Sequence, residues 1–151
     1  MVYMEKFDVI VIGGGSGLNV AAFAAQKDLK VAVIEPGPMG GTCLNRGCIP
    51  SKMLIESAEV AQTINRSPTF GVESEIKSVD FKSIMERTMS FIDEEAQQIE
   101  EAIKNSSQYT LYKHFAHFTG PKTLLVGKEE IEGEKIIIAA GTKPFVPPIK
   151  G

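Results

Sequence analysis

Near its start, the chain places a glycine-rich turn, Gly13–Gly17, between a short apolar run and an alanine-rich segment. The run Phe7–Ile12 is β-branched and almost uninterrupted, which is typical of a buried parallel strand. Leu18–Lys27 has high helical propensity, and Val31–Ile34 forms a second apolar run that ends at Glu35. This is the order of a βαβ unit, whose crossover is right-handed in nearly all proteins. The sequence therefore predicts an α/β fold built on a parallel sheet.

The glycine turn has the composition of a dinucleotide-binding turn. Such a turn needs glycines for a sharp bend, for close approach to a pyrophosphate, and for tight helix–strand packing. Gly13 and Gly15 fill the first two positions, but Leu18 fills the third, so helix and strand should lie further apart or the leucine should displace the helix. Backbone N–H groups of Gly15 to Gly17 would bind the pyrophosphate, and Glu35 would accept hydrogen bonds from ribose hydroxyls. A glycine turn in another α/β fold is the alternative.

The middle of the chain is predicted to be helical. One helix spans Pro50–Asn65, and a polar loop follows over Arg66–Lys77. A longer helix, Asp80–Lys104, carries an apolar seam at heptad spacing, formed by Met85, Met89, Ile92, Ala96, Ile99 and Ile103. We interpret it as a surface helix on the core; a helix–helix contact with another subunit is the alternative.

The last part of the chain changes to short strand-like segments. They are Tyr109–Phe118, Thr123–Val126 and Lys135–Ala139, interrupted by glycines that include Gly127 and Gly133. This pattern predicts a small β-meander, and the proline-rich residues 147–151 are predicted to be a linker.

Cys43 and Cys48 are the only two cysteines in the sequence. In a regular helix, residues five apart have Cα atoms about 8.6 Å apart, whereas a disulfide requires roughly 4.4–6.8 Å. The pair can therefore form a bridge only across a distorted segment, which Gly47 permits and which Pro50 favours by disfavouring helical geometry at Ile49. Such a bridge is easily reduced, and its place at the entrance to a helix stabilises the thiolate. The pair is predicted to be a redox-active disulfide.

Other interpretations of these residues remain open. A structural disulfide is disfavoured because the chain looks cytosolic. A zinc site would need Cys43 and Cys48 with His114 and His117, but the histidines are three apart in a strand-like stretch and should face opposite sides of it. Lys52 is either a solvated lysine or a charge that favours an anionic group at the redox centre.

Bulk properties restrict the class of protein. A length of 151 residues suits one domain, and a hydrophobic content of 43% with a charged content of 23% fits a soluble globule. The net charge of −3 argues against nucleic acid or an anionic membrane as a partner. Neither a signal peptide nor an apolar run of the ~20 residues needed to span a membrane is visible in the sequence, so a cytoplasmic location is predicted.

Three motifs occur in the order seen in one enzyme family. They are Val11–Gly17, the segment Gly40–Lys52 (GGTCLNRGCIPSK) and Ile136–Pro144 (IIIAAGTKP). Together they resemble the pyridine nucleotide–disulfide oxidoreductases over essentially the whole chain. The cysteine motif looks most like that of the dihydrolipoamide dehydrogenases, with near variants in mycothione, mercuric and glutathione reductases. Leu18 departs from the usual dihydrolipoamide dehydrogenase pattern and leaves a mycothione-reductase-like activity open.

The resemblance implies a Rossmann-like FAD/NAD(P)-binding fold and FAD as the cofactor. By this resemblance, Cys48 would face the flavin as the charge-transfer thiolate, Cys43 would be the interchange thiol, and Lys52 would lie near the reactive nitrogen of the flavin. Ala116 would contact adenine through its backbone. The residues implied for cofactor binding are Gly13, Gly15, Ser16, Gly17, Glu35, Pro36, Gly41, Thr42, Cys48, Lys52, Ala116, Ala140, Gly141 and Thr142. No metal site is implied.

The resemblance also implies a reaction. A dithiol substrate such as dihydrolipoamide would reduce the disulfide through a mixed disulfide on Cys43, and the electron pair would pass through FAD to NAD⁺. An NADPH-dependent reductase of the mycothione, mercuric or glutathione type is one alternative. A non-catalytic FAD-binding module is the other.

Family members are considerably longer than this chain. By the resemblance, residues 1–146 correspond to the N-terminal part of the FAD-binding domain, and residues 147–151 lead toward a nicotinamide-binding domain. Members end in a dimerisation domain that supplies a His–Glu base to the partner, so a homodimer is expected for the full-length protein. We therefore expect a segment that cannot complete turnover and binds FAD weakly.

Overall fold

The computed structural model describes residues 4–150 of the chain. The chain divides into two compact units. The sheet unit is formed by the chain up to Gly37 and again from Ser106 onward, and the helical unit is Pro38–Asn105. The chain therefore leaves the sheet unit after its second strand and returns to it for its third.

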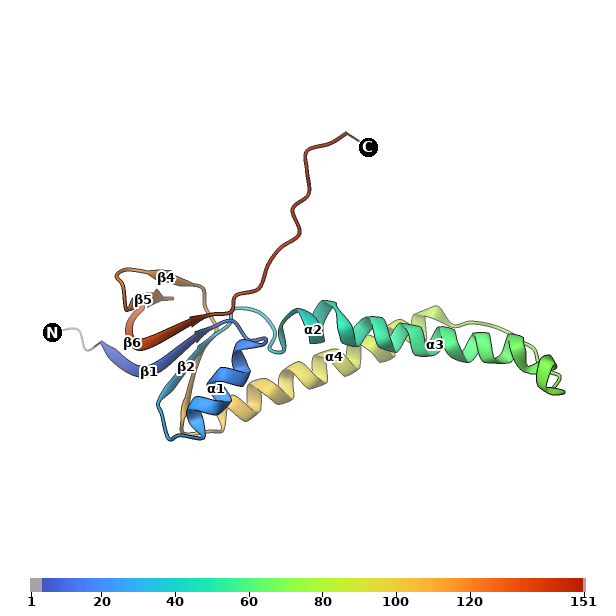
Figure 1. The fold of residues 1–151 in the computed structure, drawn as a ribbon, viewed down its shortest axis with the longest axis horizontal. Helices are drawn as coiled ribbons and strands as arrows, with labels where there is room; N and C mark the ends of the chain where they lie inside the picture. Colours follow the sequence, from blue (N-terminus) through green and yellow to red (C-terminus); the bar gives the residue numbers. More distant parts are fainter. Residues whose placement is uncertain (1–3, 151) are drawn as a thin grey trace. The chain divides into compact units, whose positions relative to one another are not determined.

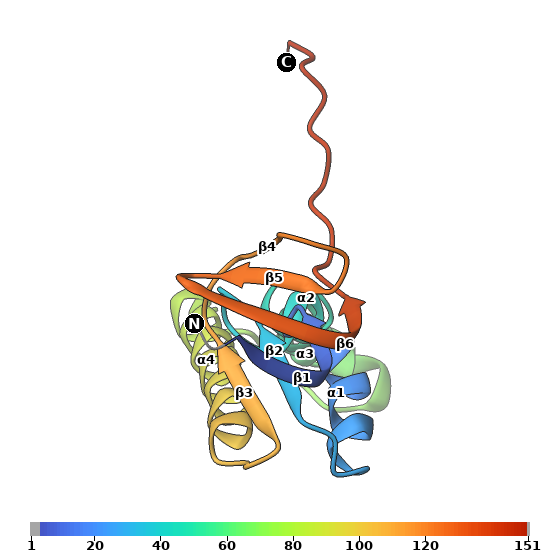
Figure 2. The same ribbon diagram turned by 90° about the vertical axis from the view of Figure 1, so that its left-hand side faces the viewer.

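The sheet unit is built on one six-stranded mixed sheet (Figures 1 and 2). Its elements are β1 (Glu5–Ile12), α1 (Gly17–Ala25), β2 (Val31–Ile34), β3 (Tyr109–Tyr112), β4 (Ala116–Phe118), β5 (Thr123–Val126) and β6 (Glu129–Ile138). The strand order is β3-β2-β1-β6-β5-β4, with parallel pairing from β3 to β6 and antiparallel pairing from β6 to β4. The predicted α/β fold with a parallel sheet and a β-meander is confirmed.

The central strands are apolar because both of their faces are covered. All four residues of β2 are buried, and Ile10 and Val11 of β1 are completely inaccessible to solvent. Leu124 and Ile131 bring the meander into the same core as Ile10. This burial explains why β1 and β2 have uninterrupted apolar runs rather than alternating patterns.

One predicted strand is two strands in the structure. Tyr109–Phe118 was expected to be continuous, but β3 ends at Tyr112 and β4 begins at Ala116. β3 pairs with β2 at one edge of the sheet, whereas β4 pairs with β5 at the other (Figure 2). The apolar pattern does not contain this change of edge, because both halves have strand-like composition.

The reverse difference is found at Gly133, where the sequence predicted a break and the structure has one continuous strand. β6 instead runs through it from Glu129 to Ile138. A Cβ atom at position 133 would lie 2.7 Å from Cδ1 of Ile10, so the glycine makes room for a core side chain of the neighbouring strand. A glycine within a strand commonly marks this kind of close approach.

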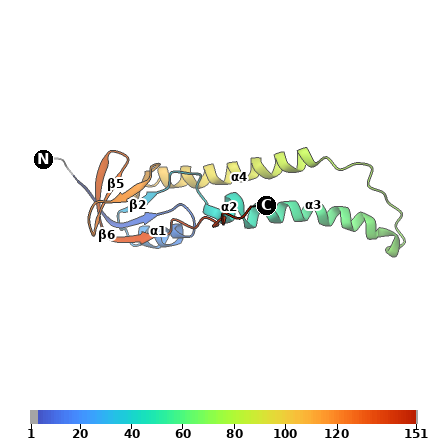
Figure 3. The same ribbon diagram turned by 90° about the horizontal axis from the view of Figure 1, so that it is seen from above.

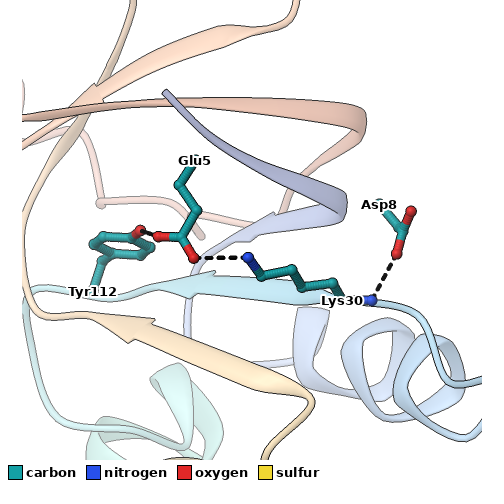
Figure 4. A network of polar contacts seen from close by, with 4 residues as sticks. All are labelled: Glu5, Asp8, Lys30 and Tyr112. Carbon is teal, nitrogen blue, oxygen red and sulfur yellow. Dashed lines mark hydrogen bonds and ion pairs between the residues drawn. The ribbon is translucent and has the colours of Figure 1, made fainter. Parts of the chain in front are cut away.

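A polar network joins three segments of the sheet unit (Figure 4). The Glu5 carboxylate accepts a hydrogen bond from Tyr112 Oη at 3.0 Å and forms an ion pair with Lys30 Nζ at 2.8 Å. The backbone N–H of Lys30 donates to the Asp8 carboxylate at 2.7 Å. The network links the start of β1 to the residue before β2 and to the end of β3.

The helical unit consists of three α-helices and one short 3₁₀ helix. They are α2 (Gly41–Arg46), α3 (Cys48–Arg66), η1 (Ser67–Phe70) and α4 (Phe81–Lys104). α3 and α4 lie side by side within this unit (Figures 1 and 3), and Arg87 Nη2 donates to Ser57 Oγ between them at 2.8 Å. The Asp80 side chain caps α4 by accepting from the Ser83 backbone N–H at 3.0 Å, as expected for an aspartate before a helix.

The long predicted helix is confirmed, with one change in its apolar seam. Ile92, Ala96 and Ile103 are buried as expected, but Met89 is exposed and Thr88 is buried in its place. Thr88 tolerates burial because its hydroxyl donates to the Ile84 carbonyl at 2.9 Å. Among residues 4–150, no helix is long and apolar enough to cross a membrane.

Candidate functional site

The turn after β1 requires glycine at its first position. Gly13 has φ +117°, and a Cβ atom there would lie 2.1 Å from the Ala139 carbonyl oxygen. The same Cβ would lie 3.1 Å from the backbone nitrogen of Ala140. The backbone of β1 thus turns directly against the end of β6, and two of the predicted site residues, Gly13 and Ala140, lie together.

Close packing of α1 on β1 depends on Gly17 rather than on position 18. A Cβ atom at Gly17 would lie 2.7 Å from Cγ1 of Val11 and 2.8 Å from Cβ of Ala139. Gly17 is buried, whereas Leu18 is half-buried. The expectation that Leu18 would separate or displace the helix is therefore wrong, because the glycine that permits tight packing stands one residue earlier.

The start of α1 presents backbone donors. The hydrogen bonds of the described residues include no acceptor for the backbone N–H groups of Gly15 and Ser16. Ser16 is the N-cap residue and makes no side-chain capping bond. Unsatisfied N–H groups at a helix N-terminus favour an anion, so this turn fits a pyrophosphate.

Glu35 lies directly beside this turn. One carboxylate oxygen accepts from the backbone N–H of Gly14 at 2.8 Å, and the other accepts from the N–H of Gly37, also at 2.8 Å. The carboxylate is therefore held between the glycine turn and the segment that follows β2. Pro36, another predicted site residue, lies in this segment and is exposed.

Sequence reasoning missed Lys113, which contacts the same segment. Its ammonium group donates to the Gly37 carbonyl at 2.5 Å. The backbone N–H of Glu35 also donates to the Tyr112 carbonyl at 3.0 Å, which extends the pairing of β2 and β3. Nothing in the sequence indicates this contact, because Gly37 and Lys113 are 76 residues apart.

The remaining predicted cofactor residues of the sheet unit lie at strand ends. Ala116 is the first residue of β4, and Ala140, Gly141 and Thr142 follow the end of β6. Gly141 has φ +73°, a conformation that favours glycine.

The cysteines lie in two consecutive helices of the helical unit. Cys43 is in α2, Cys48 is the first residue of α3, and Gly47 separates the helices. A Cβ atom at Gly47 would lie 3.0 Å from the Thr42 carbonyl oxygen, so glycine permits the tight break between them. The expected distortion of the segment is present at Gly47. It is absent at Ile49, which is helical because a proline in the first helical turn breaks no hydrogen bond.

The two sulfur atoms interact without a bond between them. Both cysteines are unbridged and exposed. A hydrogen bond with Cys48 raises the pKa of the Cys43 thiol above its ordinary value, and Lys52 opposes this effect only weakly. The Cys43 thiol therefore holds its proton more tightly than a free cysteine does. The arrangement can form a disulfide and can exchange with one.

The other predicted residues of this motif shape the entrance to α2. Gly40 and Gly41 both have positive φ, and a Cβ atom at Gly40 would lie 2.3 Å from the Leu44 side chain. Asn45 Nδ2 donates to the carbonyls of Met39 and Gly41 at 2.9 Å. Thr42 is exposed in the first turn of α2.

The histidines considered for a metal site lie in the β3–β4 connection and in β4. His114 lies outside the strands and its ring is next to Gly127, whereas His117 pairs with Leu125. In the part of the chain that the structure describes, no group of three His, Cys, Asp or Glu side chains could hold a metal ion.

The known proteins to which this chain is similar belong to one class of enzymes. A family model described as pyridine nucleotide-disulphide oxidoreductase matches residues 7–151. A dihydrolipoyl dehydrogenase of Bacillus subtilis is 37% identical over 95% of this chain and 33% of its own length. A mycothione reductase of Mycobacterium tuberculosis is 35% identical over 96% of this chain and 33% of its own. The chain therefore spans about a third of the length of these curated relatives.

A solved structure has the same fold. The Cu(II) complex of the HOCl-induced flavoprotein disulfide reductase RclA from Escherichia coli superposes with a TM-score of 0.77 at 28% identity. The match covers 93% of this chain and 29% of that one.

Proposed function

The chain belongs to the pyridine nucleotide–disulphide oxidoreductase family, and on this premise we propose that it is the FAD-binding, dithiol-bearing part of a flavoprotein disulfide oxidoreductase. The specific reaction that we propose is that of a dihydrolipoamide dehydrogenase, which uses NAD⁺ as the electron acceptor. Because the chain spans a third of its relatives' length, the complete reaction belongs to a longer assembly. The proposed assembly is a cytoplasmic homodimer.

The observation that carries the proposal is the glycine turn with its neighbouring carboxylate. Free N–H groups of Gly15 and Ser16 would hold the FAD pyrophosphate, and Glu35, fixed by Gly14 and Gly37, would hold the adenosine ribose. Ala116, Ala140, Gly141 and Thr142 complete the proposed cofactor residues of the sheet unit, and Gly41, Thr42 and Lys52 those of the helical unit. When bound, FAD supplies a two-electron carrier between thiols and a nicotinamide nucleotide.

The cysteine pair would perform the thiol chemistry by exchange. In the oxidised enzyme, a substrate thiolate attacks Cys43, a substrate–Cys43 bond forms, and Cys48 leaves as a thiolate. The second substrate thiol, deprotonated, then displaces Cys43, which leaves as a thiolate and takes up a proton. The substrate is released as a disulfide and the enzyme retains a dithiol. The raised pKa of Cys43, caused chiefly by its hydrogen bond with Cys48, supports the uptake of a proton by Cys43 when it leaves.

Two relatives with different activities, a dihydrolipoyl dehydrogenase and a mycothione reductase, define the second candidate. The mycothione reductase matches this chain almost as well as the dihydrolipoyl dehydrogenases do. An NADPH-dependent reductase of a small disulfide is therefore the alternative, with electrons flowing in the opposite direction. A non-catalytic FAD-binding module is the third possibility, and a thiolate–flavin interaction separates it from both enzymes.

The test is a visible absorbance titration of the purified chain with FAD, followed by reduction with dithiothreitol. We expect binding, and a long-wavelength shoulder after two-electron reduction because the Cys48 thiolate donates charge to the flavin. Cys48→Ser should abolish the shoulder, whereas the matched Cys43→Ser variant should keep it. A spectrum of free FAD throughout would contradict the proposed cofactor site.

The substrate is tested by replacing dithiothreitol with dihydrolipoamide or with reduced mycothiol in a single turnover. Faster reduction of the FAD-loaded chain by dihydrolipoamide supports the dehydrogenase. Faster reaction with mycothiol supports the reductase alternative.

A further inference from the structure

The connection between β3 and β4 joins two segments that the proposed function assigns to adenosine. It begins at Lys113, which contacts the turn after β2, and it ends at Ala116, the first residue of β4. Glu35 in that turn is the proposed ribose ligand, and Ala116 is the proposed adenine contact. The connection therefore runs from a residue that contacts the proposed ribose-binding turn to the proposed adenine contact.

The backbone N–H and the carbonyl of Gly37 form hydrogen bonds with two different side chains. Its N–H donates to the Glu35 carboxylate at 2.8 Å, and its carbonyl accepts from Lys113 Nζ at 2.5 Å. The lysine is half-buried, so its charged hydrogen bond is less exposed to water than one at the surface. A change at Lys113 would therefore act on the Glu35 carboxylate through Gly37.

The residue that follows Lys113 lies close to another turn of the sheet unit. The His114 ring lies so close to Gly127 that a Cβ atom there would be 3.0 Å from its Cδ2. His114, the residue after Lys113, therefore lies beside the β5–β6 turn.

We infer that Lys113 is a positioning residue for the adenosine half of FAD, acting by holding Gly37 and, through it, the Glu35 carboxylate. This inference rests on the proposed FAD-binding function. Its contribution to FAD binding therefore depends on Glu35.

The first test measures the dissociation constant of FAD by flavin fluorescence with the full chain. Lys113→Met keeps the length of the side chain and removes its charge, and should weaken FAD binding about tenfold, the size of a charge-assisted hydrogen bond. Lys113→Arg should restore most of the affinity, because arginine can also donate to the Gly37 carbonyl. Lys128→Met, at an exposed lysine in the β5–β6 turn, is the matched control and should bind FAD like the wild type.

A double-mutant cycle with Glu35→Gln separates positioning from general stability. If Lys113 acts through Glu35, adding Lys113→Met to Glu35→Gln should weaken FAD binding much less than tenfold. Full additivity, or unchanged affinity in Lys113→Met, overturns the inference and leaves the proposed function intact. If Lys113→Met does not fold, the same cycle is run with Lys113→Ala, and full additivity with Glu35→Gln again overturns the inference. Failure of the wild type to bind FAD overturns the proposed function and this inference with it.

Discussion

Gly17 shows how one missing methyl group sets the position of a helix. The residue is buried, and its absent Cβ would lie within 2.8 Å of both Val11 Cγ1 and Ala139 Cβ. We predict that Gly17→Ala lowers the free energy of unfolding by about 1–3 kcal/mol through overpacking, despite the better helix propensity of alanine. Urea denaturation of the FAD-free chain measures this effect. Asn19→Ala, at an exposed position of α1, is the control, and an equal or higher stability of Gly17→Ala would show that α1 can move without cost.

Glu5 makes the stability of the sheet unit depend on pH. Its pKa is lowered chiefly by the hydrogen bond with Lys30 and further by the one with Tyr112, partly offset by burial (Figure 4). A carboxyl group with a depressed pKa in the folded state stabilises the fold above its unfolded pKa, and this contribution is lost as pH falls through the folded pKa.

We therefore predict that the wild type loses more stability than Glu5→Gln on acidification from about pH 6 to about pH 3, the range around an unperturbed carboxyl pKa. The difference should be less than about 1 kcal/mol, because the pair is partly exposed and solvent screens it. Chemical denaturation at several pH values measures it, and high salt should reduce it. Parallel pH profiles of the two proteins would show that the network of Figure 4 contributes nothing to acid sensitivity.

At the scale of elements, the break between α2 and α3 places the two thiols. One continuous helix would hold Cys43 and Cys48 too far apart to interact, whereas the break at Gly47 lets their sulfur atoms share a hydrogen bond. Local sequence favours this break, since the glycine ends α2 and Pro50 is tolerated in the first turn of α3.

We predict that Gly47→Ala slows disulfide formation between Cys43 and Cys48 several-fold, because its Cβ would press on the Thr42 carbonyl 3.0 Å away and move α2 from α3. The measurement is the rate of thiol loss under oxidised glutathione. Thr63→Ala, at an exposed position of α3, should oxidise at the wild-type rate. If Gly47→Ala also oxidises at that rate, the break needs no glycine.

At the scale of the whole molecule, local signals predicted more than long-range ones. β2 and β5 were predicted at their observed boundaries because an apolar run and its flanking turns lie within a few residues. Three features were not predictable in this way: the division of Tyr109–Phe118 into two strands, the continuity of β6 through Gly133, and the contact of Lys113 with Gly37. Each depends on a partner strand or residue distant in sequence, which composition and periodicity do not encode.

The candidate site follows the same rule. The cysteine motif and the glycine turn are each one continuous run of residues, so their residues were identified from the sequence. The role of Gly17 depends on Val11 and Ala139, and Ala139 is far away in the chain. The spacing of the glycine pattern therefore placed the close contact between α1 and β1 at Leu18, whereas in the structure Gly17 makes it.

The distribution of burial predicts that protection from hydrogen exchange differs along the chain. All residues of β2 are buried, whereas α3 has no buried residue along its length. Opening free energies range from roughly zero in exposed elements to the global value in core strands. We therefore expect amides of β2 to exchange far more slowly than those in the second half of α3, residues 57–66.

FAD binding should raise protection from hydrogen exchange beyond the global increase only at the residues proposed to bind it. A ligand that binds the folded state stabilises it by about 2.7 kcal/mol at a hundredfold excess over its dissociation constant, and locally contacted amides gain protection as well. Protection should rise at Gly13–Ser16 and at Glu35–Gly37, while residues 57–66 of α3 should gain no more than the global increment. Riboflavin, which lacks the pyrophosphate and adenosine, is the matched control and should protect neither glycine segment. If FAD protects α3 more than the glycine turn, the cofactor binds elsewhere, and the turn with Glu35 is not its anchor.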